Sequence, residues 1–225
     1  MGDNTLLVTG GTGFLGAYCI LELPEAGYRV RTTVRSPERS PQVRDAQRRC
    51  ARRVGRNRRG GPHPRPSWAA AVAGCAYVLH VASPFPERSP CDENDLIIPA
   101  RDGSLRVLRA AHEAGVRRVV LTSSFAAIGY GHATVDHVFT ERDWTDPANP
   151  GVGAYQRSKT LAERAAWEFA QHEAVSLELA VIDPVGIVGP RARAQPIHLD
   201  AADAAPSQSR LTRVAPAVFR HRRCP

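Results

Sequence analysis

Hydrophobic and polar positions along the chain alternate between the periods of strands and helices. Apolar and β-branched residues form short runs typical of buried strands at 5–9, 28–34, 76–82, 117–122 and 177–182. Between these runs, apolar residues recur at helical spacing over 14–23, 92–114 and 154–171. Strands that alternate with helices predict a fold of the α/β class, a doubly wound parallel sheet covered on both faces.

Two stretches show neither period. Residues 42–66 and the chain after Pro190 are rich in Arg, Pro and small residues, and the strand expected between 34 and 76 is not recognisable. We expect one folded domain over 1–190 with an irregular insertion at 42–66, followed by an irregular tail at 191–225. This composition is typical of a GC-rich gene translated in another frame, and two disordered arginine-rich segments are the alternative.

The net charge of +8 comes from the same two stretches. Residues 44–59 carry +7 and residues 191–225 carry +5, so the rest of the chain is mildly acidic. Without interleaved aromatic residues, these arginines do not favour nucleic-acid binding. The histidines show no metal-ligand spacing. We expect His80, which lies on a predicted strand, to be a core residue, and Trp144 and Trp167 to pack in the core.

The cysteines and the lengths of the apolar runs indicate where in the cell the protein is expected. The five cysteines are scattered without a CxxC pair, which favours a reducing compartment over disulfides or a zinc site. No apolar run approaches the ~20 residues that span a bilayer, and the N-terminus shows no signal peptide. We therefore expect a cytoplasmic protein that binds no metal, no membrane and no nucleic acid.

Three glycines, Gly10, Gly13 and Gly16, follow the first predicted strand where a helix begins. The first allows a tight turn, the second the close approach of a ligand, and the third close packing of the helix on the sheet. Free N–H groups at the start of the helix then face a diphosphate. A tight turn without a ligand is the alternative, and the position after the first strand of a βαβ unit favours the diphosphate site.

The end of the second predicted strand bears on the choice of dinucleotide. An acidic residue there would bind the ribose 2′-hydroxyl of NAD, but this chain has Arg35 at that point. A guanidinium suits the 2′-phosphate of NADP. The sequence therefore favours NADP over NAD, with a solvated surface arginine as the alternative.

Tyr155 and Lys159 share one face of a predicted helix because they are four residues apart. An adjacent ammonium is expected to lower the pKa of the phenol and let it exchange a proton. Lys159 is the only lysine beside 29 arginines, which suggests that this position requires lysine. Ser124, after a predicted strand, lies where it could hydrogen-bond a carbonyl oxygen that Tyr155 protonates. Strand-end capping is the alternative for both Ser123 and Ser124, and suits Ser123 better.

Taken together, six motifs resemble those of extended short-chain dehydrogenases/reductases, and within them the dihydroflavonol reductase and cinnamoyl-CoA reductase-like group of the NAD-dependent epimerase/dehydratase superfamily. They are TGGTGFLG (9–16), TVRSP (33–37), HVASPF (80–85), LTSSFAAIGYG (121–131), YQRSKTLAE (155–163) and DPVGIVGP (183–190). The resemblance implies a Rossmann fold and NADPH-dependent reduction of a ketone or aldehyde to an alcohol. It also implies a homodimer formed through the helices at 92–114 and 154–171.

Carried over to this chain, the resemblance implies Ser124, Tyr155 and Lys159 as the catalytic set. It further implies a cofactor site made of Gly10, Gly13, Phe14, Leu15, Gly16, Arg35, Val81, Ala82, Ser83, Thr122, Tyr155, Lys159, Pro184, Val185, Gly186 and Ile187. The chain also departs from the family. An Asp-hydrophobic pair that contacts the adenine has no match at 42–66, and the C-terminal substrate domain is largely missing after Pro190.

Other functions remain open from the residues alone. A sugar-nucleotide epimerase or dehydratase would use the same Tyr and Lys, but such enzymes usually retain NAD, which Arg35 disfavours. A non-catalytic NADP-binding regulator fits the missing substrate domain but not the complete Ser, Tyr and Lys set. An inactive, truncated remnant is the remaining alternative.

Overall fold

The computed structural model describes residues 4–34, 63–64, 67–85, 90–133, 137–189 and 218–221. One sheet contains the strands β1 (Thr5–Thr9), β2 (Arg29–Val34), β3 (His63–Pro64), β4 (Tyr77–His80), β5 (Arg118–Thr122), β6 (Glu178–Asp183) and β7 (Val218–His221). The helices are α1 (Phe14–Glu22), α3 (Trp68–Val72), α4 (Asn94–Glu113) and α5 (Ala154–His172), with a 3₁₀ turn, η2 (Phe125–Ala127).

The strand order is β3-β2-β1-β4-β5-β6-β7, and every neighbouring pair is parallel except β6 and β7. β1 lies between β2 and β4, so that Leu6 is opposite both Val30 and Tyr77. The chain goes from β1 to β2 on one side and later returns to β4 on the other. The winding therefore reverses at β1, and sheets of this kind bind ligands at the carboxyl ends of the strands beside such a reversal.

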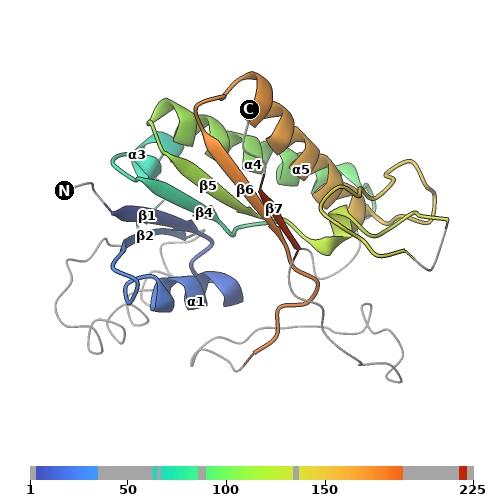
Figure 1. Ribbon diagram of the computed structural model, residues 1–225, viewed down its shortest axis with the longest axis horizontal. Helices are drawn as coiled ribbons and strands as arrows, with labels where there is room; N and C mark the ends of the chain where they lie inside the picture. Colours follow the sequence, from blue (N-terminus) through green and yellow to red (C-terminus); the bar gives the residue numbers. More distant parts are fainter. Residues whose placement is uncertain are drawn as a thin grey trace.

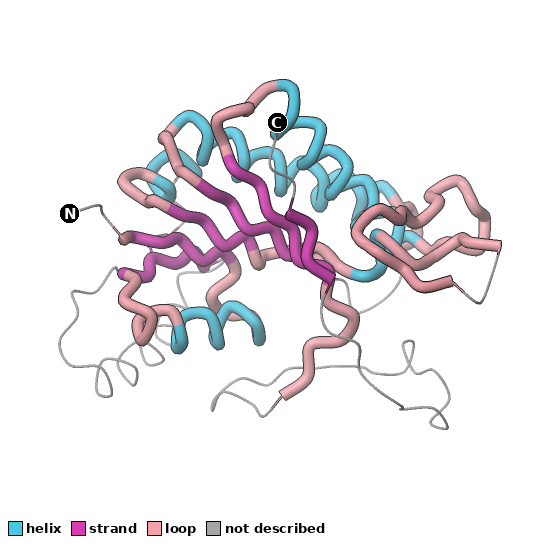
Figure 2. The backbone as a smooth tube through the Cα atoms, in the orientation of Figure 1, coloured by secondary structure: helices cyan, strands magenta, loops and turns pink. Residues whose placement is uncertain are grey.

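Helices cover both faces of the sheet: α1 lies on one face, and α3, α4 and α5 lie on the other (Figures 1 and 2). Successive side chains of a strand point to opposite faces, so β1 contributes to two cores. Leu7 belongs to the core under α4 and α5, whereas Leu6 and Val8 pack with Ile20 of α1. Both faces are thus buried, which explains why the sequence of β1 is an unbroken apolar run.

The structure confirms the predicted doubly wound parallel sheet. Each predicted strand and helix begins and ends within two residues of its expected bounds. Two short strands that the pattern did not predict lie within the irregular stretches: β3 pairs with β2, in the place of the unrecognised strand, and β7 pairs with β6. The rest of these stretches, including residues 44–59, lies outside the described residues.

The core residues singled out from the sequence lie where they were expected. His80 is 5% exposed on β4, and Trp167 is part of the core under α4 and α5. Trp144 packs against the same core and lies under the guanidinium of Arg164. Among the described helices, none is both long and apolar enough to cross a membrane.

Candidate active site

A cavity of about 960 Å³ runs along the carboxyl edge of the sheet. It extends from Thr33 and Val34 of β2 to Pro184, Val185 and Ile187 after β6. Strands lie about 4.8 Å apart, so the five strand ends from β2 to β6 span about 19 Å. The described residues that line the cavity include no Asp or Glu, and their cations are Arg106 and Lys159. The slot therefore suits an elongated anionic ligand.

The two ends of this cavity differ in the residues that border them. The β6 end is bordered by Ser124, Tyr155, Lys159 and Pro184, and the β2 end by Thr33 and Val34. Gly10, Thr12, Gly13 and Leu15 line the cavity between them. The glycine turn thus lies in the middle of the slot, where a dinucleotide has its diphosphate.

The glycine turn has the geometry of a diphosphate site. Gly10 has a φ of 72°, and a Cβ on it would lie 3.0 Å from Ala82 Cα, so a side chain there would be both strained and crowded. Gly13 caps α1 without a side chain, and its amide donates to the Gly10 carbonyl at 2.9 Å. The first N–H groups of a helix have no partner within it. Together with the positive end of the helix dipole, they fit a bound dinucleotide.

The three predicted catalytic residues meet at the β6 end. The Ser124 hydroxyl lies close enough to the Tyr155 phenol to lower the pKa of that phenol, and Lys159 Nζ lies 5.9 Å from the centroid of the Tyr155 ring. Ser124 Oγ also accepts from the Ala126 amide at 3.2 Å and caps η2. The capping expected of Ser123 therefore falls to Ser124, which holds its hydroxyl beside the phenol.

Burial raises the pKa of the Tyr155 phenol, the hydrogen bond from Ser124 lowers it, and Tyr130 adds to the rise. The phenol also lies edge-on to Phe85, with ring centroids 5.3 Å apart. The prediction that Lys159 lowers the pKa of Tyr155 is therefore wrong in this structure, because an apolar setting outweighs the distant ammonium. At neutral pH the phenol is protonated and available as a proton donor.

Lys159 is buried among charged groups that the sequence analysis did not assign. Burial lowers the pKa of Lys159 to about 8, while the carboxylates of Asp183 and Glu163 act to raise it. Glu163 is fully buried one turn further along α5 and accepts from Trp167 Nε1 at 3.3 Å. Asp183 is 1% exposed at the end of β6, beside the segment of Ser124. These carboxylates favour the ammonium form of Lys159 at neutral pH.

His80 lies behind the catalytic set. Its Nδ1 is 2.8 Å from Thr9 Oγ1, which also accepts from the Ala82 amide at 3.0 Å. Burial, and secondly the charge of Lys159, lowers the pKa of His80 to about 4. His80, Ser104, Lys159 and Glu163 are among the residues around a second, smaller cavity of about 180 Å³ between α4 and the sheet edge.

Neutral His80 is expected to make the protein sensitive to acid. Below pH 6.5 the unfolded chain takes up a proton that folded His80 refuses until about pH 4, so stability falls as pH drops through this window. The loss attributable to His80 is about 3 kcal/mol. Urea unfolding between pH 7 and pH 4 measures it, and His80→Asn should flatten the pH dependence. His172→Asn, at an exposed position on the last turn of α5, should leave the slope as in the wild type.

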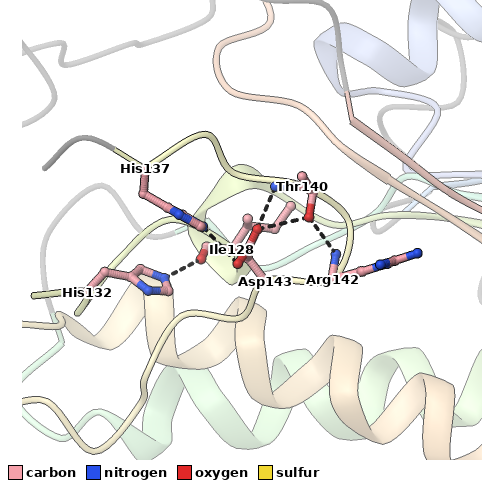
Figure 3. Close-up of polar contacts among 6 residues, drawn as sticks. All are labelled: Ile128, His132, His137, Thr140, Arg142 and Asp143. Carbon is pink, nitrogen blue, oxygen red and sulfur yellow. Dashed lines mark hydrogen bonds and ion pairs between the residues drawn. The ribbon is translucent and has the colours of Figure 1, made fainter. Parts of the chain in front are cut away.

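A loop between η2 and α5 is held together by its own polar side chains. The Asp143 carboxylate accepts from the Thr140 amide at 2.7 Å and from the Thr140 hydroxyl and His137 Nε2 at 3.0 Å, as Figure 3 shows. The Thr140 amide is the main cause that lowers the pKa of Asp143. His132 Nε2 lies 2.9 Å from the Ile128 carbonyl oxygen. These contacts give the loop a fixed shape beside Tyr130 and the catalytic set.

The cavity gathers most residues of the predicted cofactor site. Its lining includes Gly10, Gly13, Phe14, Leu15, Gly16, Val81, Ala82, Ser83, Thr122, Ser124, Tyr155, Lys159, Pro184, Val185 and Ile187. Gly186 is not among the lining residues, and Arg35 lies outside the described residues. The prediction missed Thr12, Thr33, Val34, Trp68, Phe85, Arg106 and Ser123. Thr12, Thr33, Val34, Phe85 and Ser123 stand inside quoted motifs, whereas Trp68 and Arg106 carry no motif signal.

The chain is similar to plant reductases. It is 38% identical over 198 residues to an anthocyanidin reductase ((2S)-flavan-3-ol-forming) of Vitis vinifera, covering 84% of this chain and 57% of that protein. It is 35% identical over 193 residues to a dihydroflavonol 4-reductase of Dianthus caryophyllus, covering 83% of this chain and 53% of the relative. The chain thus spans little more than half the length of these relatives.

Solved structures of reductases are also similar to this chain. The yeast methylglyoxal/isovaleraldehyde reductase complexed with NADPH superposes with a TM-score of 0.68 at 29% identity, over 84% of this chain and 59% of that one. The model of the NAD dependent epimerase/dehydratase family matches residues 6–205. The matches confirm the resemblance seen in the six motifs. The chain belongs to the NAD dependent epimerase/dehydratase family.

Proposed function

We propose that this chain is the nucleotide-binding part of an NADPH-dependent reductase that converts a ketone or aldehyde to an alcohol. The observation that carries the proposal is the convergence of Ser124, Tyr155 and Lys159 at one end of a slot whose middle is the glycine turn. A proton donor and a dinucleotide site within one cavity are what a carbonyl reduction needs.

The chemistry of each residue follows from its setting. When bound, NADPH supplies the hydride that the carbonyl carbon takes up. The Tyr155 phenol, kept protonated by burial, gives its proton to the carbonyl oxygen as the alcohol forms. Ser124 donates a hydrogen bond to the same oxygen and orients it. The ammonium of Lys159 offers donors to the ribose hydroxyls of the dinucleotide, and a proton from solvent restores the phenol of Tyr155.

The choice of NADP rests on Arg35 and on the relatives. Arg35 directly follows Val34, which lines the β2 end of the cavity. A guanidinium at that point suits the 2′-phosphate, and the solved yeast reductase is a complex with NADPH. The scattered cysteines favour the cytoplasm as the site of action.

Titration of the purified chain with NADPH and NADH, followed by turnover with a panel of aldehydes and ketones, tests the proposal. We expect fluorescence quenching at micromolar NADPH, weaker binding of NADH, and NADPH oxidation with at least one carbonyl compound. Tightly retained NAD would instead indicate an epimerase or dehydratase. NADPH binding without turnover across the panel would indicate an NADP-binding regulator, and no binding at all would contradict the proposal entirely.

A further inference from the structure

Glu163 is a charged side chain to which neither the catalytic set nor the cofactor site gives a role. It lies on α5 and is 0% exposed, and the other buried carboxylate among the described residues is that of Asp183. A carboxylate loses its hydration on burial, so it is stable inside a protein only where positive charge and hydrogen-bond donors compensate. The groups around Glu163 therefore indicate its role.

Glu163 lies between Lys159 and Trp167 on one face of α5. Lys159 comes one turn before it and Trp167 one turn after it, each at the four-residue spacing that places side chains on the same face. Trp167 Nε1 donates a hydrogen bond to Glu163 Oε1 at 3.3 Å, and the indole belongs to the core under α4 and α5. The carboxylate is thus anchored by the turn of α5 that lies further from the catalytic set.

Lys159 stands between the two cavities. It lines the large cavity together with Tyr155, and it also lines the smaller cavity of about 180 Å³. Glu163 lines the smaller cavity but is not among the residues that line the large one. A ligand in the large cavity would therefore meet Lys159 directly, whereas Glu163 would act on that ligand through Lys159.

The ammonium of Lys159 depends on nearby carboxylates for its stability. The other titratable groups around it come from β4, α4, α5 and β6 and are His80, Arg106, Tyr155 and Asp183. At neutral pH His80 is neutral and the phenol of Tyr155 is protonated, so neither offsets the burial of Lys159. Burial lowers the pKa of Lys159 to about 8, and the carboxylates of Asp183 and Glu163 act against this shift.

We propose that Glu163 is a positioning residue for Lys159, whose ammonium its carboxylate keeps charged beside the large cavity. The proposal rests on the proposed function, since Lys159 then offers its donors to the ribose hydroxyls of a dinucleotide. A neutral amine would lack the charge that attracts an anionic dinucleotide. Glu163 therefore extends the pH range in which the chain binds NADPH toward higher pH.

The charge on Lys159 can be measured without a dinucleotide, because it is the only lysine of the chain. Lysine labelled with ¹³C at Cε gives one side-chain signal, whose shift is followed by NMR from pH 6 to pH 10. We expect the midpoint of the wild-type chain near pH 8. Glu163→Gln, which removes the charge but retains an oxygen acceptor for Trp167, should lower the midpoint by about one pH unit or more.

Two further variants separate charge from packing. Glu163→Asp keeps the charge and should leave the midpoint within about half a pH unit of the wild type. Glu168→Gln removes the same charge from an exposed position on α5, where solvent screens it, and should leave the midpoint unchanged. Glu163→Asp also keeps the proposal falsifiable if Glu163→Gln does not fold, since a midpoint lowered by a full unit despite the retained charge would contradict it.

NADPH titrations of the same samples connect the charge to the site. Glu163→Gln should bind NADPH like the wild type at pH 6 and about tenfold more weakly above pH 8, where its lysine is neutral. The loss for NADH should be equal, because both dinucleotides have the same ribose hydroxyls beside the nicotinamide.

Other outcomes overturn the inference. An unchanged lysine midpoint in Glu163→Gln would show that Glu163 does not stabilise the ammonium. Equal weakening of NADPH binding at every pH, with an unchanged midpoint, would assign Glu163 a packing role only. If the wild-type chain bound neither dinucleotide, the proposed function would fail, and the lysine signal would still decide whether Glu163 acts on Lys159.

Discussion

Tyr155→Phe should lower the turnover number of the chain about 10²- to 10⁴-fold with any carbonyl compound that it reduces. The substitution removes only the hydroxyl, which lies beside the hydroxyl of Ser124 and is the proposed proton donor. The ring remains, together with its edge-on contact to Phe85, so the fold and the cofactor site are retained. Steady-state kinetics and an NADPH titration of the same preparation separate the loss of chemistry from any loss of binding.

Tyr130→Phe is the matched control for this experiment. Tyr130 is 41% exposed and close enough to influence Tyr155 electrostatically, but it makes no hydrogen bond to the catalytic set among the described contacts. Its loss should change turnover by less than about threefold, as for most surface substitutions. Equal impairment of both variants, or full activity of Tyr155→Phe, would assign the proton donor to another group.

The sheet was predictable because buried strands consist of apolar and β-branched residues, which are recognisable in the sequence. β1 packs on both faces, so every position is apolar or β-branched, and its predicted and observed bounds agree. α4 begins at Asn94 and not at Asp92, since the Asp92 carboxylate accepts from the Asn94 amide at 2.9 Å and forms a turn before the helix. α3 was missed because five residues, four of them Ala or Val, are too few to show a helical period.

The catalytic set was predictable for a different reason. Tyr155 and Lys159 are joined by helical spacing, and Ser124 follows a strand that ends at the ligand-binding edge. Their electrostatics were not predictable, because the pKa of Tyr155 depends on burial that only the tertiary structure creates. The charge of Asp183 acts to raise the pKa of Lys159. This effect was not predictable either, because it depends on the packing of α5 beside the end of β6. Trp68 of α3 and Arg106 of α4 line the same cavity, which the sequence could not show because it depends on the packing of α3 against α4.

Gly16→Ala should destabilise the protein by about 1–3 kcal/mol, as overpacking of a closed site does, and should weaken NADPH binding strongly. A Cβ on Gly16 would overlap the Gly10 carbonyl oxygen and lie 2.9 Å from the Gly10 carbonyl carbon and 3.1 Å from Gly11 Cα. These neighbours are backbone atoms of the turn itself. The Gly10 carbonyl also accepts from the Gly13 amide at 2.9 Å, so relief of the clash would distort the proposed diphosphate site.

Gly103→Ala makes this prediction specific. Gly103 also lies inside a helix, α4, but a Cβ there would meet no atom within 4 Å. Helix propensity alone favours Ala over Gly by about 1 kcal/mol at both positions. Gly103→Ala should therefore stabilise the protein while Gly16→Ala destabilises it, as measured by urea unfolding and NADPH titration. If both substitutions raised stability and left NADPH binding intact, α1 could not lie as close to the turn as the structure has it. The glycine turn would then not be the diphosphate site.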